Sequence, residues 1–246
     1  MAQLIPKHLS NRSLASLPQA LLESPHKQSQ IDRIQQIAAS ILKHCDGLLI
    51  PGGEDIESEF YGKKISWGGR FQNLSPSDFP LKMLKTKRSM LEFALIQGAQ
   101  RKKMITMGTC RGSQMINVFF GGTLKNLPQI DYGLSRLKLV DSPFGRWLKN
   151  LVGDHVISFS AHHQAYDRMG SGLQVILEKN GIPKFFVSED GLFLGSQIHP
   201  EVYIDLNKKS DDVSSFIAKQ NQSIYDYFVR LIKQQANHSH AKSLTA

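Results

Sequence analysis

The chain has 246 residues, of which 41% are hydrophobic and 21% are charged, so it has the size and composition of a globular protein with a buried core. No apolar run approaches the length of a transmembrane helix, and residues 1–40 lack the charged-then-apolar pattern of a signal peptide. Two cysteines, Cys45 and Cys110, are too few for a disulfide framework. We therefore expect a single cytoplasmic domain over residues 1–236, followed by a disordered tail over 237–246.

The formal net charge of +9 is compatible with nucleic-acid binding. The basic residues, however, are spread over short groups such as Lys63-Lys64 and Lys208-Lys209, and no group is interleaved with aromatic residues in a binding motif. Solvated surface is the simpler interpretation. We expect neither a nucleic-acid partner nor a membrane partner.

The first clear element along the chain is a helix. Apolar residues recur at helical spacing over residues 31–45, and Asp46-Gly47 ends the pattern. Cys45 is then expected to be a buried, inert thiol in the apolar stripe of that helix. Residues 48–50 follow as a short strand that is apolar on both faces, as in a parallel sheet.

The same alternation continues through the middle of the chain. Residues 89–100 are expected to form a helix, 104–107 a buried strand and 114–120 the next helix. Alternating helices and buried strands predict an α/β fold with a mainly parallel sheet. After Asp154 the pattern changes to short strands at 155–160, 173–177, 184–188 and 192–197, and then to a final amphipathic helix over 213–231.

Cys110 lies in the sequence Gly108-Thr109-Cys110-Arg111-Gly112, between an expected strand and an expected helix. This G-x-C-x-G pattern is the thiol form of the nucleophile elbow, in which a tight turn holds the nucleophile above the sheet. The helix N-terminus after the sulfur favours the thiolate, which is the reactive form. An isolated G-x-C-x-G more often marks an ordinary turn with a buried cysteine, so this interpretation requires a base and an oxyanion site.

Candidates for both requirements follow other expected strands. His199 and Glu201 are two residues apart, so in extended backbone the carboxylate can orient the imidazole as a general base. The turn Pro51-Gly52-Gly53 can direct a backbone N–H toward an oxyanion, and the N–H of Arg111 can supply a second donor. Open α/β sheets place their chemistry at the carboxyl ends of the strands, where these groups lie.

These segments resemble the class I glutamine amidotransferase-like superfamily. The closer resemblance is to its peptidase C26 branch of γ-glutamyl hydrolases, which includes γ-glutamyl-γ-aminobutyrate hydrolases. The matching segments are DGLLIPGGEDIESEFYG (46–62), MGTCRGSQMINVFFGGTLKNLPQ (107–129), SAHHQAYDRMGSGLQVI (160–176) and GSQIHPE (195–201). The resemblance implies a flavodoxin-like three-layer sandwich with a mainly parallel central sheet.

The resemblance also implies roles for individual residues. Cys110 would be the nucleophile, His199 the general base and Glu201 the residue that orients His199. The oxyanion donors would be Gly53 and Arg111. The residues that recognise the substrate would be Gln114, His162, His163 and Gln164. The implied reaction is hydrolysis of a γ-glutamyl amide through a thioester, with no metal or organic cofactor. A metal site at the histidine pair is disfavoured because no third ligand has suitable spacing.

The sequence also departs from the family pattern. Ser58 stands where proline is usual, and Ser89 follows Arg88 where the family usually has aspartate. The segment Gly181-Ile182-Pro183-Lys184 replaces one that commonly contains Ile-Glu-Ala, so substrate specificity near Lys184 is expected to differ.

Three functions are compatible with these features. We favour a free-standing hydrolase of small γ-glutamyl amides, because no synthetase domain is attached. The first alternative is a glutaminase subunit that passes ammonia to a separate synthetase, and a homodimer is also compatible. The second is a non-enzymatic relative that serves as an interaction module, against which the intact Cys, His, Glu and Gly-Gly set counts.

The N-terminus departs furthest from the family, whose members usually open with a βα unit and then a strand that ends in a hydrophobic-Pro pair. Here Gln3-Leu4-Ile5-Pro6 resembles that second strand, so the usual first βα unit is expected to be absent. In a 2-1-3-4-5 order the missing strand is an interior one, and its loss would leave unpaired sheet edges. We expect the 246-residue chain to be poorly soluble or inactive unless an upstream unit, residues 13–22 or a partner chain fills the gap.

The two cysteines give a direct test of the nucleophile. Cys110→Ala should abolish glutamate release, whereas Cys45→Ala should leave it intact apart from a modest loss of stability. A glutamine-analogue electrophile should label Cys110 alone. Labelling at Cys45 instead, or full activity of the Cys110→Ala variant, would end the assignment of this chain as an enzyme.

Overall fold

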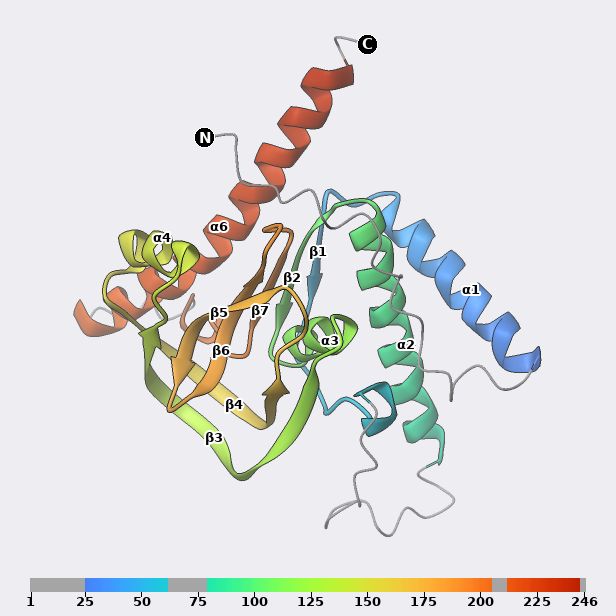
Figure 1. The fold of residues 1–246 in the computed structure, drawn as a ribbon, viewed down its shortest axis with the longest axis horizontal. Coiled ribbons are helices and arrows are strands. Elements are labelled where there is room, and N and C mark those ends of the chain that lie inside the picture. Colours follow the sequence, from blue (N-terminus) through green and yellow to red (C-terminus); the bar gives the residue numbers. More distant parts are fainter. Residues whose placement is uncertain (1–24, 62–78, 205–211, 244–246) are drawn as a thin grey trace.

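The computed structural model describes residues 25–61, 79–204 and 212–243 (Figure 1). In this part of the chain, one mixed sheet has the strand order β1-β2-β7-β6-β5-β3-β4. Its strands are β1 (Gly47–Ile50), β2 (Ile105–Thr109), β3 (Thr123–Leu139), β4 (His155–Arg168), β5 (Leu173–Lys179), β6 (Ile182–Ser188) and β7 (Phe193–Ser196). The helices are α1 (Pro25–Leu42), α2 (Phe79–Arg101), α3 (Arg111–Phe119), α4 (Pro143–Val152), α5 (Glu201–Ile204) and α6 (Asp212–Ser243), with a 3-10 turn, η2 (Ser58–Tyr61).

The sheet has a parallel part and an antiparallel part. β1, β2 and β7 pair in parallel, whereas the pairs from β7 through β6, β5 and β3 to β4 are antiparallel. The turn between β5 and β6 explains one antiparallel pair, because Asn180 and Gly181 both have positive φ, as a two-residue hairpin turn requires. The predicted α/β class is confirmed, and parallel pairing is confined to the strands that precede the candidate catalytic residues.

Helices cover both faces of the sheet, which gives three layers (Figure 1). One apolar core lies between the sheet and α2 and α3, and includes Phe93, Ile116 and Phe186. The other lies between the sheet and α4 and α6, and includes Met107 and Phe228. β2 is buried along its whole length, so the chain segment that ends in Cys110 is held from both sides.

Each predicted helix is present with different ends. α1 ends at Leu42, whose carbonyl accepts a hydrogen bond from Lys102 Nζ at 2.7 Å. Cys45 therefore lies in the turn beyond the helix, and its side chain is only partly buried, with Sγ 3.3 Å from the Ile41 carbonyl. α6 is longer than expected and extends to Ser243, into the stretch expected to form a tail.

Two strands differ from the predictions. Leu49 in β1 is 48% exposed, because only the face of β1 that carries Leu48 and Ile50 is fully packed. β3 was not predicted, although with 17 residues it is longer than any other strand in the described part of the chain. The expected N-terminal strand at residues 3–6 lies outside the described residues.

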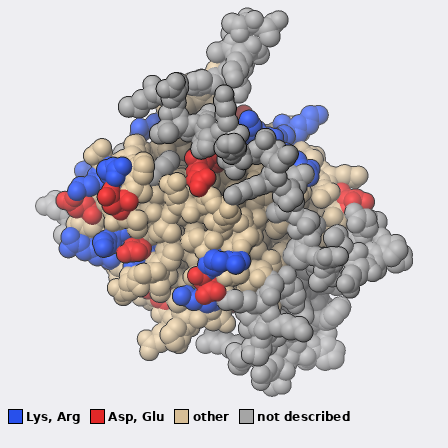
Figure 2. All heavy atoms as spheres, in the orientation of Figure 1, with Lys and Arg blue, Asp and Glu red and all other residues tan. Residues whose placement is uncertain are grey.

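No helix within the described ranges is long and apolar enough to cross a membrane. On the face in Figure 2, basic and acidic side chains lie side by side at the left and lower centre, whereas basic side chains near the upper right have no acidic neighbours among the described residues in view.

Candidate active site

The site is built where the parallel strands end. β1 is followed by Gly52 and Gly53, β2 by Cys110, and β7 by the segment that carries His199. Ile50 pairs with Gly108, and Gly108 pairs with Gly195, so the three strand ends are level. The pairing continues beyond β2, because the Cys110 N–H donates to the Ser196 carbonyl. The turns that follow the strands are therefore brought to one edge of the sheet, where open α/β sheets bind their ligands.

Cys110 has the backbone conformation of a nucleophile elbow. Its φ of 48° and ψ of −109° are unusual for a residue with a side chain, and it immediately precedes α3. A Cβ at Gly112 would overlap the Ile50 carbonyl, and one at Gly108 would overlap the Gly112 backbone, so both flanking positions need glycine. Ser113 Oγ donates to the Cys110 carbonyl at 2.6 Å and fixes the turn.

His199 and Glu201 form the expected pair. His199 Nδ1 donates to Glu201 Oε1 at 2.6 Å, and the His199 N–H donates to the Phe159 carbonyl at 2.8 Å. Tyr225 of α6 donates its hydroxyl proton to the other carboxylate oxygen, Oε2, at 3.0 Å. Burial is the largest single influence and raises the pKa of Glu201, but the hydrogen bonds from His199, the backbone and Tyr225, together with the charge of His199, outweigh it and lower the pKa overall. The carboxylate is thus held ionised by two donors.

The free nitrogen of His199 is left for Cys110. Nε2 is buried and has no oxygen or nitrogen partner among the described residues. A Cβ added at Gly52 would lie 3.4 Å from His199 Cε1 and 3.5 Å from Cys110 Cβ, so the imidazole and the thiol border one small space. The interaction with Cys110, followed by that with Glu201, raises the pKa of His199 to about 10. The raised pKa favours the imidazolium form of His199 at neutral pH, next to the Cys110 sulfur.

Sequence reasoning missed a second contact to the sulfur. The fully buried Gln197 donates from Nε2 to Cys110 Sγ at 3.7 Å. Gln197 Oε1 in turn accepts from Gln114 Nε2 at 3.2 Å. The available signal was the position of Gln197 directly after β7, two residues before His199.

The expected oxyanion donors lie beside a partly buried ionic network. Arg88 of α2 donates from Nη2 to the Gly52 carbonyl at 2.8 Å and from Nε to Glu92 at 2.7 Å. Glu92 also forms an ion pair with the Arg111 side chain, which is 2% exposed. A Cβ at Gly53, where φ is 155°, would overlap the Arg88 guanidinium. The turn after β1 and the start of α3 are thus braced by the same helix.

The residues expected to recognise the substrate lie in different environments. Gln114 is 2% exposed and donates from Nε2 to the Gln164 carbonyl at 2.6 Å. The Gln164 side chain accepts from the Ile56 N–H at 3.3 Å, on the loop after β1. His163 is exposed, with Nε2 2.6 Å from Asp55 Oδ2, whereas His162 is 5% exposed. Of the histidine pair, His163 therefore faces solvent.

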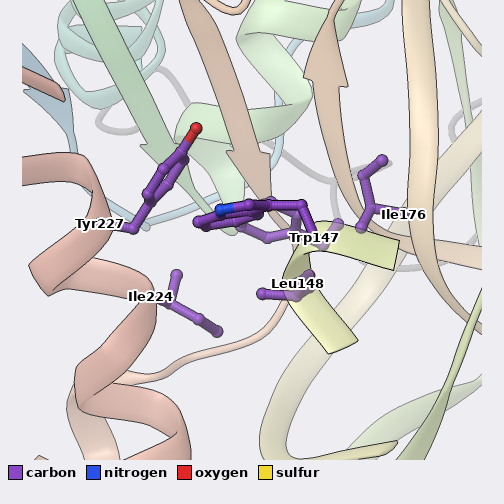
Figure 3. Close-up of a pocket in the computed structure, with 6 residues that line it drawn as sticks. Trp147, Leu148, Ile176, Ile224 and Tyr227 are labelled. Atoms are coloured by element: carbon purple, nitrogen blue, oxygen red, sulfur yellow. The ribbon is translucent and has the colours of Figure 1, made fainter. Parts of the chain in front are cut away.

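No cluster of three or more His, Cys, Asp or Glu side chains suited to a metal ion occurs within residues 25–61, 79–204 and 212–243. A small apolar pocket lies elsewhere, between α4 and α6 (Figure 3). It is lined by Trp147, Leu148, Ile176, Phe185, Ile224 and Tyr227. None of the candidate site residues lines it, and the Trp147 and Tyr227 rings lie against each other with centroids 3.9 Å apart.

Tyr225 provides a test of the His199–Glu201 geometry. Tyr225→Phe removes one donor to Glu201 and keeps the ring, so turnover should fall about tenfold, as for the loss of one hydrogen bond to a charged group. Tyr227→Phe, which alters the apolar pocket two residues along α6, should leave turnover within about twofold, since it removes no donor to the site. Equal losses in the two variants, measured with the same substrate, would contradict this role for Tyr225.

The chain is similar in sequence to one protein family and to individual proteins from other organisms. The sequence model of the peptidase C26 family matches residues 30–201. A Schizosaccharomyces pombe protein provisionally named a glutamine amidotransferase is 33% identical over 179 residues, which are 68% of this chain and 66% of that protein. A Mycobacterium tuberculosis protein with the same kind of provisional name is 30% identical over 74% of this chain and 60% of its own length. The alignments thus cover less than two thirds of these relatives.

The fold agrees with a solved structure. The crystal structure of a glutamine amidotransferase from Methylobacillus flagellatus superposes with a TM-score of 0.51 at 19% sequence identity, covering 78% of each chain. This likeness supports the class I amidotransferase-like fold. Because the family match includes the elbow, the glycine turn and the His-Pro-Glu segment, the chain belongs to the peptidase C26 family.

Proposed function

We propose that the chain is a cysteine hydrolase that cleaves the γ-glutamyl amide bond of glutamine-like small molecules and releases glutamate and an amine. Membership of the peptidase C26 family supports a hydrolase-type activity on amide bonds. The observation that carries the proposal is the His199 imidazole, hydrogen-bonded through Nδ1 to Glu201, with Nε2 buried beside Cys110.

In the proposed acylation step the Cys110 thiolate attacks the γ-carbonyl carbon, and the carbonyl oxygen takes up the negative charge. The backbone N–H groups of Gly53 and Arg111 would donate to that oxyanion. His199 then gives its Nε2 proton to the departing amine as the C–N bond breaks and the thioester forms. The raised pKa of His199 supports this step, because it keeps the proton on the imidazole until the leaving group needs it.

In the proposed deacylation step the roles of His199 reverse. The neutral imidazole takes a proton from water, and the resulting hydroxide attacks the thioester carbonyl. Collapse of the tetrahedral intermediate releases glutamate and regenerates the Cys110 thiolate beside the protonated imidazole. Through its hydrogen bond to Nδ1, Glu201 keeps the imidazole oriented with Nε2 toward the sulfur in both steps.

The names of the relatives favour one second candidate, a glutaminase subunit that passes ammonia to a synthetase. The same cysteine chemistry would serve both functions. They differ in whether the isolated chain turns over substrate steadily or needs a partner.

A substrate panel separates these functions. The purified chain should release glutamate from γ-glutamyl amides of small amines at a steady rate, with glutamine as the reference substrate. Turnover that is weak for every amide and rises only with an added synthetase would favour the glutaminase subunit. Absence of both turnover and Cys110 acylation would favour a non-enzymatic protein.

The histidines should separate in the same assay. His199→Ala should lower turnover by on the order of a thousandfold or more, as expected for loss of the general base. His163→Ala should act mainly on KM, because its imidazole lies exposed against Asp55. Equal losses of turnover in the two variants would refute this division of roles.

The pH profile of the unsubstituted chain should have an alkaline limb. The pKa of His199 is raised from 6.5 to about 10 in the folded chain, so turnover should fall as the pH rises through about 10. The interactions that raise this pKa should stabilise the folded chain fully below pH 6.5. That stabilisation should be lost as the pH rises through about 10. An alkaline limb near the ordinary histidine pKa would contradict the Cys110–His199 pair.

A further inference from the structure

A buried charged cluster lies beside the expected glutamyl site. Lys184 of β6 has a side chain with no exposed surface, and it forms an ion pair with Asp131 of β3. Lys179 of β5 binds the other Asp131 oxygen at 2.7 Å, but its side chain is 32% exposed. Burial alone raises the pKa of Asp131, and hydrogen bonds from the two lysines overcome it and lower the pKa to about 2.

The ammonium group of Lys184 has a second partner, His162 of β4. Lys184 Nζ lies 2.7 Å from His162 Nε2. An ammonium group can only donate, so Nε2 accepts and the proton of the imidazole is on Nδ1. Burial, followed by the charge of Lys184, lowers the pKa of His162 to about 4, which keeps the ring neutral at physiological pH.

The tautomer of His162 determines whether the Gln164 carbonyl oxygen faces an N–H donor or a nitrogen lone pair. His162 Nδ1 lies 3.1 Å from that carbonyl oxygen, so the tautomer imposed by Lys184 donates to it. The opposite tautomer would place the Nδ1 lone pair against the carbonyl lone pairs and push the two groups apart. The same carbonyl accepts from Gln114 Nε2 at 2.6 Å. A shift of this carbonyl would therefore move Gln114.

The chain of contacts continues to the nucleophile. Gln114 Nε2 also donates to Gln197 Oε1, and Gln197 Nε2 donates to Cys110 Sγ. The Gln197 N–H donates to the Lys184 carbonyl at 2.8 Å, so β6 and the end of β7 are joined at this point.

We propose that Lys184 is a positioning residue of the γ-glutamyl site, which acts by fixing the tautomer of His162 and, through the Gln164 carbonyl, the side chain of Gln114. The proposal rests on the proposed function for its kinetic consequence. A buried ion pair is weak evidence for stability, because apolar residues of similar volume often serve as well. The contact from Lys184 to His162 gives the pair a role that apolar residues could not replace.

Lys184→Met is the main test and Lys179→Met is the matched control. Both variants remove a partner of Asp131, but only Lys184 contacts His162. Lys184→Met should raise KM for the glutamyl substrate by about tenfold or more with kcat within about threefold, as for a lost binding interaction. Lys179→Met should leave KM within about twofold, because Asp131 keeps Lys184.

A double variant separates positioning from folding. Lys184→Met leaves Asp131 with fewer partners and should lower the melting temperature. Combining it with Asp131→Asn removes the buried carboxylate and should recover much of that loss, while KM stays raised. Recovery of KM together with stability would overturn the proposal and leave an ordinary structural ion pair.

Two further readouts do not depend on turnover. Nitrogen-15 NMR of His162 should show the Nδ1–H tautomer in the unsubstituted chain and in Lys179→Met, and a mixture of tautomers in Lys184→Met. A glutamine-analogue diazoketone should label Cys110 about tenfold more slowly in Lys184→Met, while iodoacetamide, which needs no glutamyl site, should label it at an unchanged rate.

These readouts keep the two proposals apart. If the unsubstituted chain releases no glutamate from any amide, the proposed function fails, and the tautomer of His162 still decides whether Lys184 positions it. An unchanged tautomer in Lys184→Met, or an equal rise in KM in Lys179→Met, would overturn the positioning role whatever the substrate.

Discussion

The hydrogen bond from the Cys110 N–H to the Ser196 carbonyl is the contact on which the site depends. It extends the pairing of β2 and β7 past the end of β2, so the elbow and the segment that carries His199 leave the sheet from adjacent strands in fixed register. The backbone of Cys110 is held at a φ of 48°, which an isolated turn would not keep. The burial of β2 on both faces and the glycines at 108 and 112 provide the surroundings that keep it there.

Near this contact, the ion pairs of Glu92 with Arg88 and Arg111 fix the turns that border Cys110. Glu92 is shared between Arg88 and Arg111, so one buried carboxylate links the glycine turn after β1 to the start of α3. Removing Glu92 would leave the Arg111 guanidinium, which is 2% exposed, without its ion-pair partner, and breaking a buried pair in this way costs roughly 3–5 kcal/mol. The network therefore couples the position of both expected oxyanion donors to the stability of the chain.

The sequence predicted the residues whose position follows from local pattern. Cys110, His199 and Gly53 each follow an apolar strand within three residues, and parallel strands bring such positions to one edge of the sheet. β3 escaped prediction because it contains Pro128 and Gly133 and pairs with β5 only at its end, so Tyr132 stays 75% exposed and no buried alternation results. Contacts such as Asp131 with Lys184 join residues far apart in the chain, and no spacing rule indicates them.

The two parts of the sheet divide the work of the site. The parallel strands carry the proposed reacting groups, and small changes in their register would separate Cys110 from His199. The antiparallel strands supply the Gln164 carbonyl and the buried cluster of Lys184, His162 and Asp131, which reach the reacting groups only through hydrogen bonds. Under the proposed function, substitutions in β3, β4 and β6 would therefore alter substrate selection without displacing Cys110. The departure of this chain from its family at residues 181–184 falls in that part of the sheet.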